Sequence, residues 1–222
     1  MKPTQVSEEV RIPIGGAVLP GELSIPADPH GVILFAHGSG SSRLSPRNRL
    51  VAEVLQDGHF ATLLFDLLSE DEDQGPDARF DIELLTARLL KVRHWIAGRA
   101  DLKGLRMGYF GASTGAAAAI RAAVAEPLGV GAVVTRGGRP DLAFEALEQV
   151  DVPTLLIVGG GDPEVVDRNL SALERLRCEK RMAIVPGAGH LFDEPGAVER
   201  VAEFARRWFE SHLCDHGNGG RP

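Results

Sequence analysis

Three side chains in this sequence have the types and the chain order that nucleophilic catalysis requires, namely Ser113, Asp162 and His190. A serine hydroxyl is a poor nucleophile until a neighbouring imidazole accepts its proton. The imidazole in turn needs a carboxylate on its other ring nitrogen, which fixes the tautomer and stabilises the imidazolium. The set therefore predicts Ser113 as the nucleophile, His190 as general base and then acid, and Asp162 as the residue that orients the imidazole.

The surroundings of Ser113 favour this interpretation over an ordinary turn serine. Ser113 lies between Gly111 and Gly115 in a G-x-S-x-G pattern, after the apolar run "LRMGYFGA" and before the alanine-rich run "TGAAAAIRAAVAE". A strand, a sharp turn and a helix in this order form a nucleophile elbow, in which the turn exposes the hydroxyl and small residues let the two elements pack closely. The positive end of the following helix then faces the developing oxyanion.

Each of the other two assignments has a structural alternative. His190, in "GAGHLF", could be a surface histidine with satisfied hydrogen bonds, although it follows an apolar run as a catalytic histidine would. Asp162, in "GGGDPEVVD", could cap the helix that "PEVVD" begins, and Asp167 is a weaker rival for the same catalytic role.

A glycine-rich stretch, "HGSGSS" at 37–42, follows the first strongly apolar run, "GVILFA". We expect it to supply part of an oxyanion hole, with the backbone N–H groups of Thr114 and Ser39 as donors and Gly40 as the alternative to Ser39. His37 precedes this loop. We expect it to hold the loop in place by hydrogen bonds and not to act as the base.

Three arginines fall after predicted strands at the same edge, namely Arg43, Arg136 and Arg139. Together they could bind an anionic group of a substrate, and Arg43 and Arg136 are the predicted substrate-binding residues of this set. The alternative is that they pair with the acidic residues of 69–77 or with Asp141.

Phe192 lies two residues beyond the predicted base and is expected to line the acyl or alcohol pocket, although packing explains an aromatic residue there nearly as well.

The apolar run "GAVVTRGG" and the next one are separated by only about 14 residues, which is too few for a cap domain. The sequence therefore predicts a shallow, open site that prefers small or short-chain esters.

The elements that must position these residues alternate between strands and helices along the chain. Such alternation predicts right-handed crossovers and a mostly parallel sheet with helices on both faces. In a sheet of this kind ligands bind beyond the carboxyl ends of the strands, where the predicted site residues fall. We predict a single doubly wound α/β domain over residues 1–213 without a cap domain, an antiparallel hairpin at one sheet edge formed by the first 26 residues, and a disordered tail at 214–222. The predicted helices are 45–58, 81–99, 114–126, 140–150, 165–177 and 194–213, and the predicted strands are 31–38, 60–68, 105–112, 129–138, 152–162 and 180–190.

The chain resembles the α/β-hydrolase superfamily, and within it the branch related to dienelactone hydrolase. The resemblance covers nearly the whole length, through "GVILFAHGSGSSRLSPRN", "GYFGASTGAAAA", "TLLIVGGGD" and "VPGAGHLF". Dienelactone hydrolases use a cysteine nucleophile, whereas this chain has Ser113, which favours ordinary ester hydrolysis. Some bacterial proteins of this branch carry such a domain fused to a phosphoribosyltransferase, and we expect no room for one here.

Composition bounds the function further. The net charge is −7, which argues against a nucleic-acid-binding surface, and no run reaches the ~20 apolar residues that span a bilayer. The N-terminus lacks an apolar signal segment, so a cytoplasmic location is the default expectation. Cys178 and Cys214 are expected to be unpaired thiols, and no HxH or HExxH pattern predicts a metal site, so we expect no cofactor.

The predicted function is therefore a serine hydrolase that cleaves small carboxylic esters through an acyl-enzyme. The alternatives are a lactone hydrolase, a thioesterase, an acyltransferase or a peptidase on the same triad, and a non-catalytic binding protein that kept the fold. We expect a small-molecule ester as the partner, without nucleic acid or membrane, and the sequence leaves a homodimer open.

Overall fold

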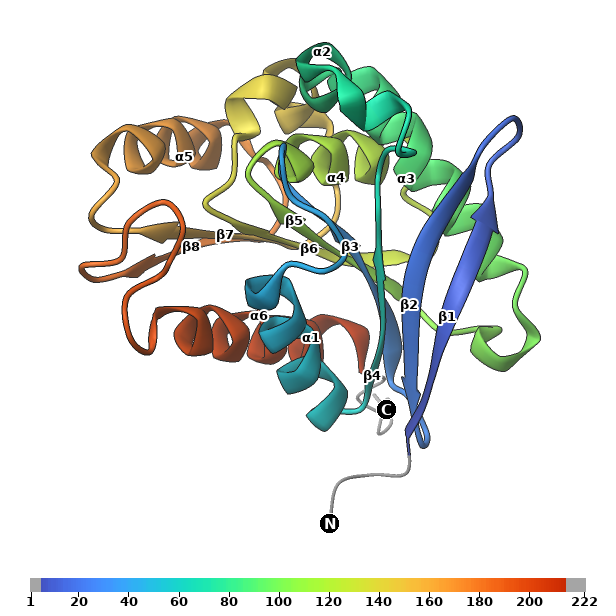
Figure 1. The fold of residues 1–222 in the computed structure, drawn as a ribbon. Coiled ribbons are helices and arrows are strands. Elements are labelled where there is room, and N and C mark those ends of the chain that lie inside the picture. The colour runs from blue at the N-terminus through green and yellow to red at the C-terminus, as the bar shows by residue number, and fades with distance from the viewer. Residues whose placement is uncertain (1–4, 215–222) are drawn as a thin grey trace.

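An eight-stranded sheet runs through the computed structural model, which describes residues 5–214 of the chain (Figure 1). The strand order is β1-β2-β4-β3-β5-β6-β7-β8. The neighbours from β4 to β8 are all parallel, as predicted from the alternation of strands and helices. The strands are β1 (Gln5–Pro13), β2 (Val18–Pro26), β3 (Gly31–Ala36), β4 (Phe60–Phe65), β5 (Met107–Ala112), β6 (Val130–Arg136), β7 (Thr154–Gly159) and β8 (Lys180–Val185).

The first two strands form the predicted antiparallel hairpin at one edge of the sheet. Strand β1 pairs with β2 from Gln5 opposite Pro26 to Pro13 opposite Val18, and β2 joins the rest of the sheet by pairing antiparallel with β4. The prediction of a hairpin at this edge is confirmed, and each of its strands has nine residues.

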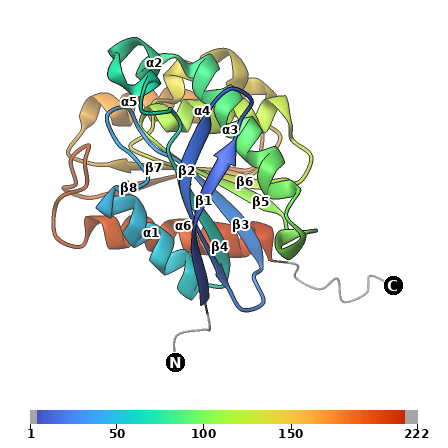
Figure 2. The same ribbon diagram turned by 45° about the vertical axis from the view of Figure 1, so that its right-hand side comes forward.

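Helices cover both faces of the sheet (Figures 1 and 2). Strands β3 to β7 are buried almost throughout, whereas β8 at the edge is largely exposed. Helices α3, α4 and α5 lie on one face and α1 and α6 on the other, with a separate cluster of buried apolar side chains under each face. The α-helices are α1 (Pro46–Asp57), α2 (Pro76–Phe80), α3 (Ile82–Ala97), α4 (Thr114–Ala125), α5 (Pro163–Arg175) and α6 (Ala197–Leu213). The predicted single doubly wound α/β domain, with a mostly parallel sheet and helices on both faces, is confirmed.

Two connections differ in detail from the sequence-based expectation. The acidic segment 69–77, expected to be a solvated loop, contains the short 3-10 helix η1 (Glu72–Gln74) and leads into α2. Its carboxylates are paired, because Glu72 meets Arg88 and Asp73 meets Arg79. A further 3-10 turn, η2 (Ala100–Leu102), follows α3.

The connection between β6 and β7 is short, as the absence of a cap domain requires. It holds η3 (Pro140–Gln149), a 3-10 helix with a kink at Ala143, where a regular helix was expected. Of the predicted tail at 214–222, residues 215–222 lie outside the described residues. Within the described part of the chain, no helix is long and apolar enough to cross a membrane.

Candidate active site

The turn between β5 and α4 has the geometry of a nucleophile elbow. Ser113 is held at φ 50° and ψ −119°, a conformation that residues with a side chain rarely adopt. The flanking glycines make this turn possible: a Cβ on Gly115 would lie 2.1 Å from the carbonyl oxygen of Ala36, and one on Gly111 would lie 2.6 Å from Cα of Ala116. The spacing of the two glycines is therefore required for the helix to start directly against the sheet.

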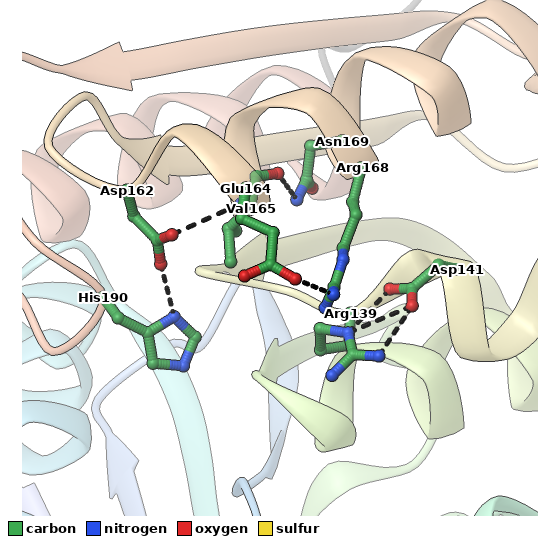
Figure 3. A network of polar contacts seen from close by, with 8 residues as sticks. All are labelled: Arg139, Asp141, Asp162, Glu164, Val165, Arg168, Asn169 and His190. Atoms are coloured by element: carbon green, nitrogen blue, oxygen red, sulfur yellow. Dashed lines mark hydrogen bonds and ion pairs between the residues drawn. The ribbon is translucent and has the colours of Figure 1, made fainter.

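The predicted base and its carboxylate are in contact (Figure 3). His190 Nδ1 lies 3.0 Å from Oδ2 of Asp162, and the two residues come from the loops after β8 and β7. The other oxygen of Asp162 accepts a hydrogen bond from the N–H of Val165 at 3.3 Å and caps α5. The carboxylate of Asp162 therefore both caps α5 and contacts His190, so the two interpretations of this residue are compatible.

The segment that follows β6 lies between the nucleophile and the base. The backbone N–H of Ser113 donates to the carbonyl oxygen of Arg136 at 3.2 Å. A Cβ on the next residue, Gly137, would lie 3.7 Å from Cε1 of His190. Ser113 Oγ has no hydrogen-bond partner among residues 5–214, so the serine–histidine bond is not formed in this resting geometry. Such bonds commonly tighten only when substrate binds, so the direct Ser113–His190 contact stays a prediction.

The loop after β3 packs against the elbow. A Cβ on Gly38 would lie 2.9 Å from Cβ of Ser113, so only glycine allows this approach. Ser41 closes a turn by donating its N–H to the carbonyl oxygen of Gly38 at 3.1 Å. The N–H of Ser39, one of the two predicted oxyanion donors, points at Oγ1 of Thr114 at 2.9 Å. The loop therefore lies against the elbow, with the N–H of Ser39 bound within the protein, and its role as an oxyanion donor stays a prediction.

His37 fixes this loop through both ring nitrogens. Its Nδ1 lies 2.9 Å from the carbonyl oxygen of Gly38, and its Nε2 accepts the backbone N–H of Leu67 at 3.0 Å. These contacts require the neutral ring with the proton on Nδ1. Burial lowers the pKa of His37, against the raising effects of the Gly38 hydrogen bond and of nearby Asp66 and Asp73. The expectation that His37 holds the loop is confirmed by these bonds.

This arrangement predicts a pH dependence of stability. Because the pKa of His37 is lower in the folded state than in the unfolded chain, the unfolded chain takes up the proton first as pH falls below about 6.5. The free energy of unfolding should therefore decrease from pH 7 to pH 5 more steeply in the wild type than in the His37→Gln variant. Urea unfolding at both pH values measures the difference, and equal decreases in the two proteins would contradict it.

The predicted arginine cluster is mostly neutralised. Arg43 binds Asp66 through both its backbone N–H and its guanidinium, each at 2.6 Å. Arg139 binds Asp141 through two nitrogens at 2.8 and 2.7 Å (Figure 3), which is the pairing considered as the alternative. Arg136 has no ion pair within the described residues, and its Nη1 is buried without a hydrogen-bond partner. Of the three, only Arg136 is without an ion pair among the described residues.

Phe192 lies inside the protein and not at an open pocket. It is 1% exposed, belongs to the apolar cluster under α1 and α6, and has a positive φ of 58°. A Cβ on Gly137 would lie 3.3 Å from its ring. Phe192 thus anchors the loop that carries His190, and packing, the alternative to a lining role, accounts for it.

Two residues near the site were not singled out from the sequence. Arg47, at the start of α1, binds Asp193 at 2.7 Å, and its Nε is buried without a partner. Arg47 lies 143 positions before His190 in the chain, so only the fold brings it to the histidine loop. Asp193 follows the predicted base by three residues, and this spacing was the signal that could have drawn attention to it. No cluster of three His, Cys, Asp or Glu side chains suited to a metal ion occurs in the described part of the chain.

Comparison with known proteins identifies the family. No protein-family model matches the chain. A solved structure named dienelactone hydrolase, from Anabaena variabilis, shares 51% of its residues with this chain, with a TM-score of 0.92, and the match covers 94% of this chain and 99% of that one. The chain belongs to the dienelactone hydrolase family of α/β-hydrolases.

Other relatives extend the comparison. A Mycobacterium tuberculosis protein named "Putative phosphoribosyl transferase" is 52% identical over 213 residues, and the match covers 96% of this chain. The chain spans about half the length (48%) of that relative. The esterase Est1E of Butyrivibrio proteoclasticus, solved with ferulic acid, matches with a TM-score of 0.79 over 92% of this chain and 99% of its own, but at 15% identity it supports the fold alone.

Proposed function

We propose that this member of the dienelactone hydrolase family is a serine hydrolase that cleaves small or short-chain carboxylic esters. The observation that carries the proposal is the His190–Asp162 pair, which lies at the same sheet edge as a serine held in a strained elbow. A carboxylate on Nδ1 leaves Nε2 of His190 as the basic nitrogen, which is what a serine nucleophile requires.

The proposed reaction has two steps. His190 accepts the proton of Ser113 as Oγ bonds to the ester carbonyl carbon, and the tetrahedral intermediate collapses when the same proton passes to the leaving alkoxide. Water then attacks the acyl-enzyme, again losing its proton to His190, and the carboxylic acid departs with Ser113 restored. Asp162 stabilises the imidazolium in both steps.

The substrate size follows from the connection between β6 and β7. That connection holds only η3 and brings no cap over the catalytic edge. We therefore expect p-nitrophenyl acetate and butyrate to be cleaved with far higher kcat/KM than the palmitate ester. A preference for long chains would contradict the proposal.

Labelling by a fluorophosphonate probe in the wild type, and its loss in Ser113→Ala, tests the nucleophile independently of the substrate.

A lactone is the second candidate substrate, because the 51%-identical structure is named dienelactone hydrolase. A small lactone series assayed beside the esters separates the two. The transferase name of the mycobacterial relative refers to a protein about twice as long, and the proposal gives this chain no part in that activity.

The unpaired Arg136 suggests that the ester carries a carboxylate. Asp193 is ion-paired with Arg47 and acts on Arg136 only electrostatically, without an ion pair, so this group of two arginines and one carboxylate has one positive charge in excess. Burial is the main cause that lowers the pKa of Arg136 to about 10, and the charge of Arg47 lowers it further, whereas Asp193 raises it. Arg136 is therefore charged at neutral pH. Its Cζ lies 5.9 Å from the centre of the ring of Phe192, which follows His190 by two residues. A monoanionic group bound by Nη1 would satisfy the excess charge.

Replacement of Arg136 by glutamine tests this anion subsite. The ratio of kcat/KM for a p-nitrophenyl hemisuccinate to that for the matched neutral butyrate should fall by about tenfold or more, because a hydrogen bond between charged groups is lost. Arg207→Gln, on the exposed side of α6, removes an equal charge away from the site and should leave the ratio unchanged. An unchanged ratio in the Arg136 variant would rule out the subsite while leaving ester hydrolysis intact.

A further inference from the structure

The oxyanion hole of this protein has one expected donor that is already engaged. The N–H of Ser39 donates to Oγ1 of Thr114 at 2.9 Å. Thr114 follows the nucleophile directly, and its side chain is 2% exposed. The contact therefore joins the oxyanion loop to the elbow inside the protein, immediately beside Ser113.

Both sides of this contact are held by close packing. The loop is held by the close approach of Gly38 to Cβ of Ser113 and by the hydrogen bonds of both ring nitrogens of His37. The helix is fixed by Gly115 against the carbonyl oxygen of Ala36. Since neither element can withdraw without losing these contacts, the N–H of Ser39 stays on the threonine oxygen unless the threonine side chain rotates.

The O–H of the Thr114 side chain is a hydrogen-bond donor without an acceptor among the described residues. A hydroxyl has one O–H donor and two acceptor lone pairs, and Ser39 occupies one lone pair. Among residues 5–214 no acceptor receives the O–H of Thr114, and the backbone N–H of Thr114, in the first turn of α4, also has no partner. An oxygen that already accepts a hydrogen bond becomes a stronger donor through its own proton.

We infer that Thr114 supplies two donors to the oxyanion, its backbone N–H and its side-chain Oγ1–H, with Ser39 aligning the hydroxyl instead of binding the oxyanion itself. The inference rests on the proposed function, because it concerns the tetrahedral intermediate of acyl transfer. It revises the expectation that both donors are backbone N–H groups. Thr114 Oγ1–H is a neutral donor that strengthens its bond as negative charge develops on the carbonyl oxygen.

The test compares Thr114→Val, which keeps the shape and removes the hydroxyl, with Thr114→Ser, which keeps the hydroxyl. We expect Thr114→Val to lower kcat for p-nitrophenyl butyrate about 100-fold or more with little change in KM, as for the loss of one oxyanion donor. Thr114→Ser should stay within about tenfold of the wild type. A Thr114→Val variant with unchanged or raised kcat would overturn the inference, because the released N–H of Ser39 would then be the donor.

A second readout separates this role from a structural one. The inhibition constant of a trifluoromethyl ketone, which forms an oxyanion on Ser113, should rise in Thr114→Val by the factor by which kcat/KM falls. A loss of activity without a matching loss of inhibitor affinity would overturn the inference. If Thr114→Val does not fold, Thr114→Ala removes the hydroxyl without adding a methyl group and replaces it in both measurements. If the wild type cleaves no ester and Ser113 takes no fluorophosphonate label, the proposed function itself has failed.

Discussion

Replacing Ser113 by alanine is expected to reduce kcat/KM for p-nitrophenyl butyrate by a factor of about 10⁴ or more. The reason is that alanine removes the hydroxyl that the elbow at the end of β5 holds, close to the segment that contacts His190. Initial rates at substrate concentrations below KM measure the loss. An alanine variant that retains more than about 1% of the wild-type value would contradict the assignment.

The backbone of the elbow gives this prediction an internal control. Because φ is 50° at residue 113, alanine keeps the strain that serine bears, whereas glycine relieves it. We therefore expect Ser113→Gly to be equally inactive but about 1 kcal/mol more stable to urea than Ser113→Ala. Loss of activity in two variants whose stabilities differ shows that the missing hydroxyl, and not a disturbed fold, is the cause. Equal stabilities would mean that the turn is not strained.

The sequence predicted the sheet and the contact between Asp162 and His190 because their signals are local. Alternating apolar runs define strands, and the positions of Asp162 and His190 after two of them follow from chain order alone. Hydrogen bonds and ion pairs between segments that are distant in the chain could not be predicted. The bond from Ser39 to Thr114, and the pairing of Arg43 with Asp66 instead of a residue in 69–77, depend on how loops are packed.

Phe192 illustrates the same limit from another side. An aromatic residue two positions beyond a catalytic histidine is compatible with a pocket wall and with a core anchor. Its positive φ turns the ring inward to pack below Gly137, and no pattern in "GAGHLF" encodes that turn. Likewise, the sequence does not indicate that Arg136 is the unpaired arginine of the three, because the ion pairs of Arg43 with Asp66 and of Arg139 with Asp141 depend on the fold.

Replacing Asp162 by asparagine should lower kcat by about 10⁴ while leaving stability nearly unchanged. Asp162 uses one oxygen for the cap of α5 and the other for Nδ1 of His190. Asparagine caps a helix as well as aspartate, but its amide cannot hold the imidazole in the tautomer that leaves Nε2 basic, nor stabilise the imidazolium.

The alanine variant at the same position separates the two tasks of this carboxylate. Asp162→Ala should lose the catalytic rate to a similar extent and also about 1 kcal/mol of unfolding free energy, because the bond to the N–H of Val165 is lost as well. Asp167→Asn, five residues after the cap of α5, is the matched control, and its kcat should equal that of the wild type. If instead Asp167→Asn is the inactive variant and Asp162→Asn retains its rate, the carboxylate partner of His190 in catalysis is not the one that it contacts at rest.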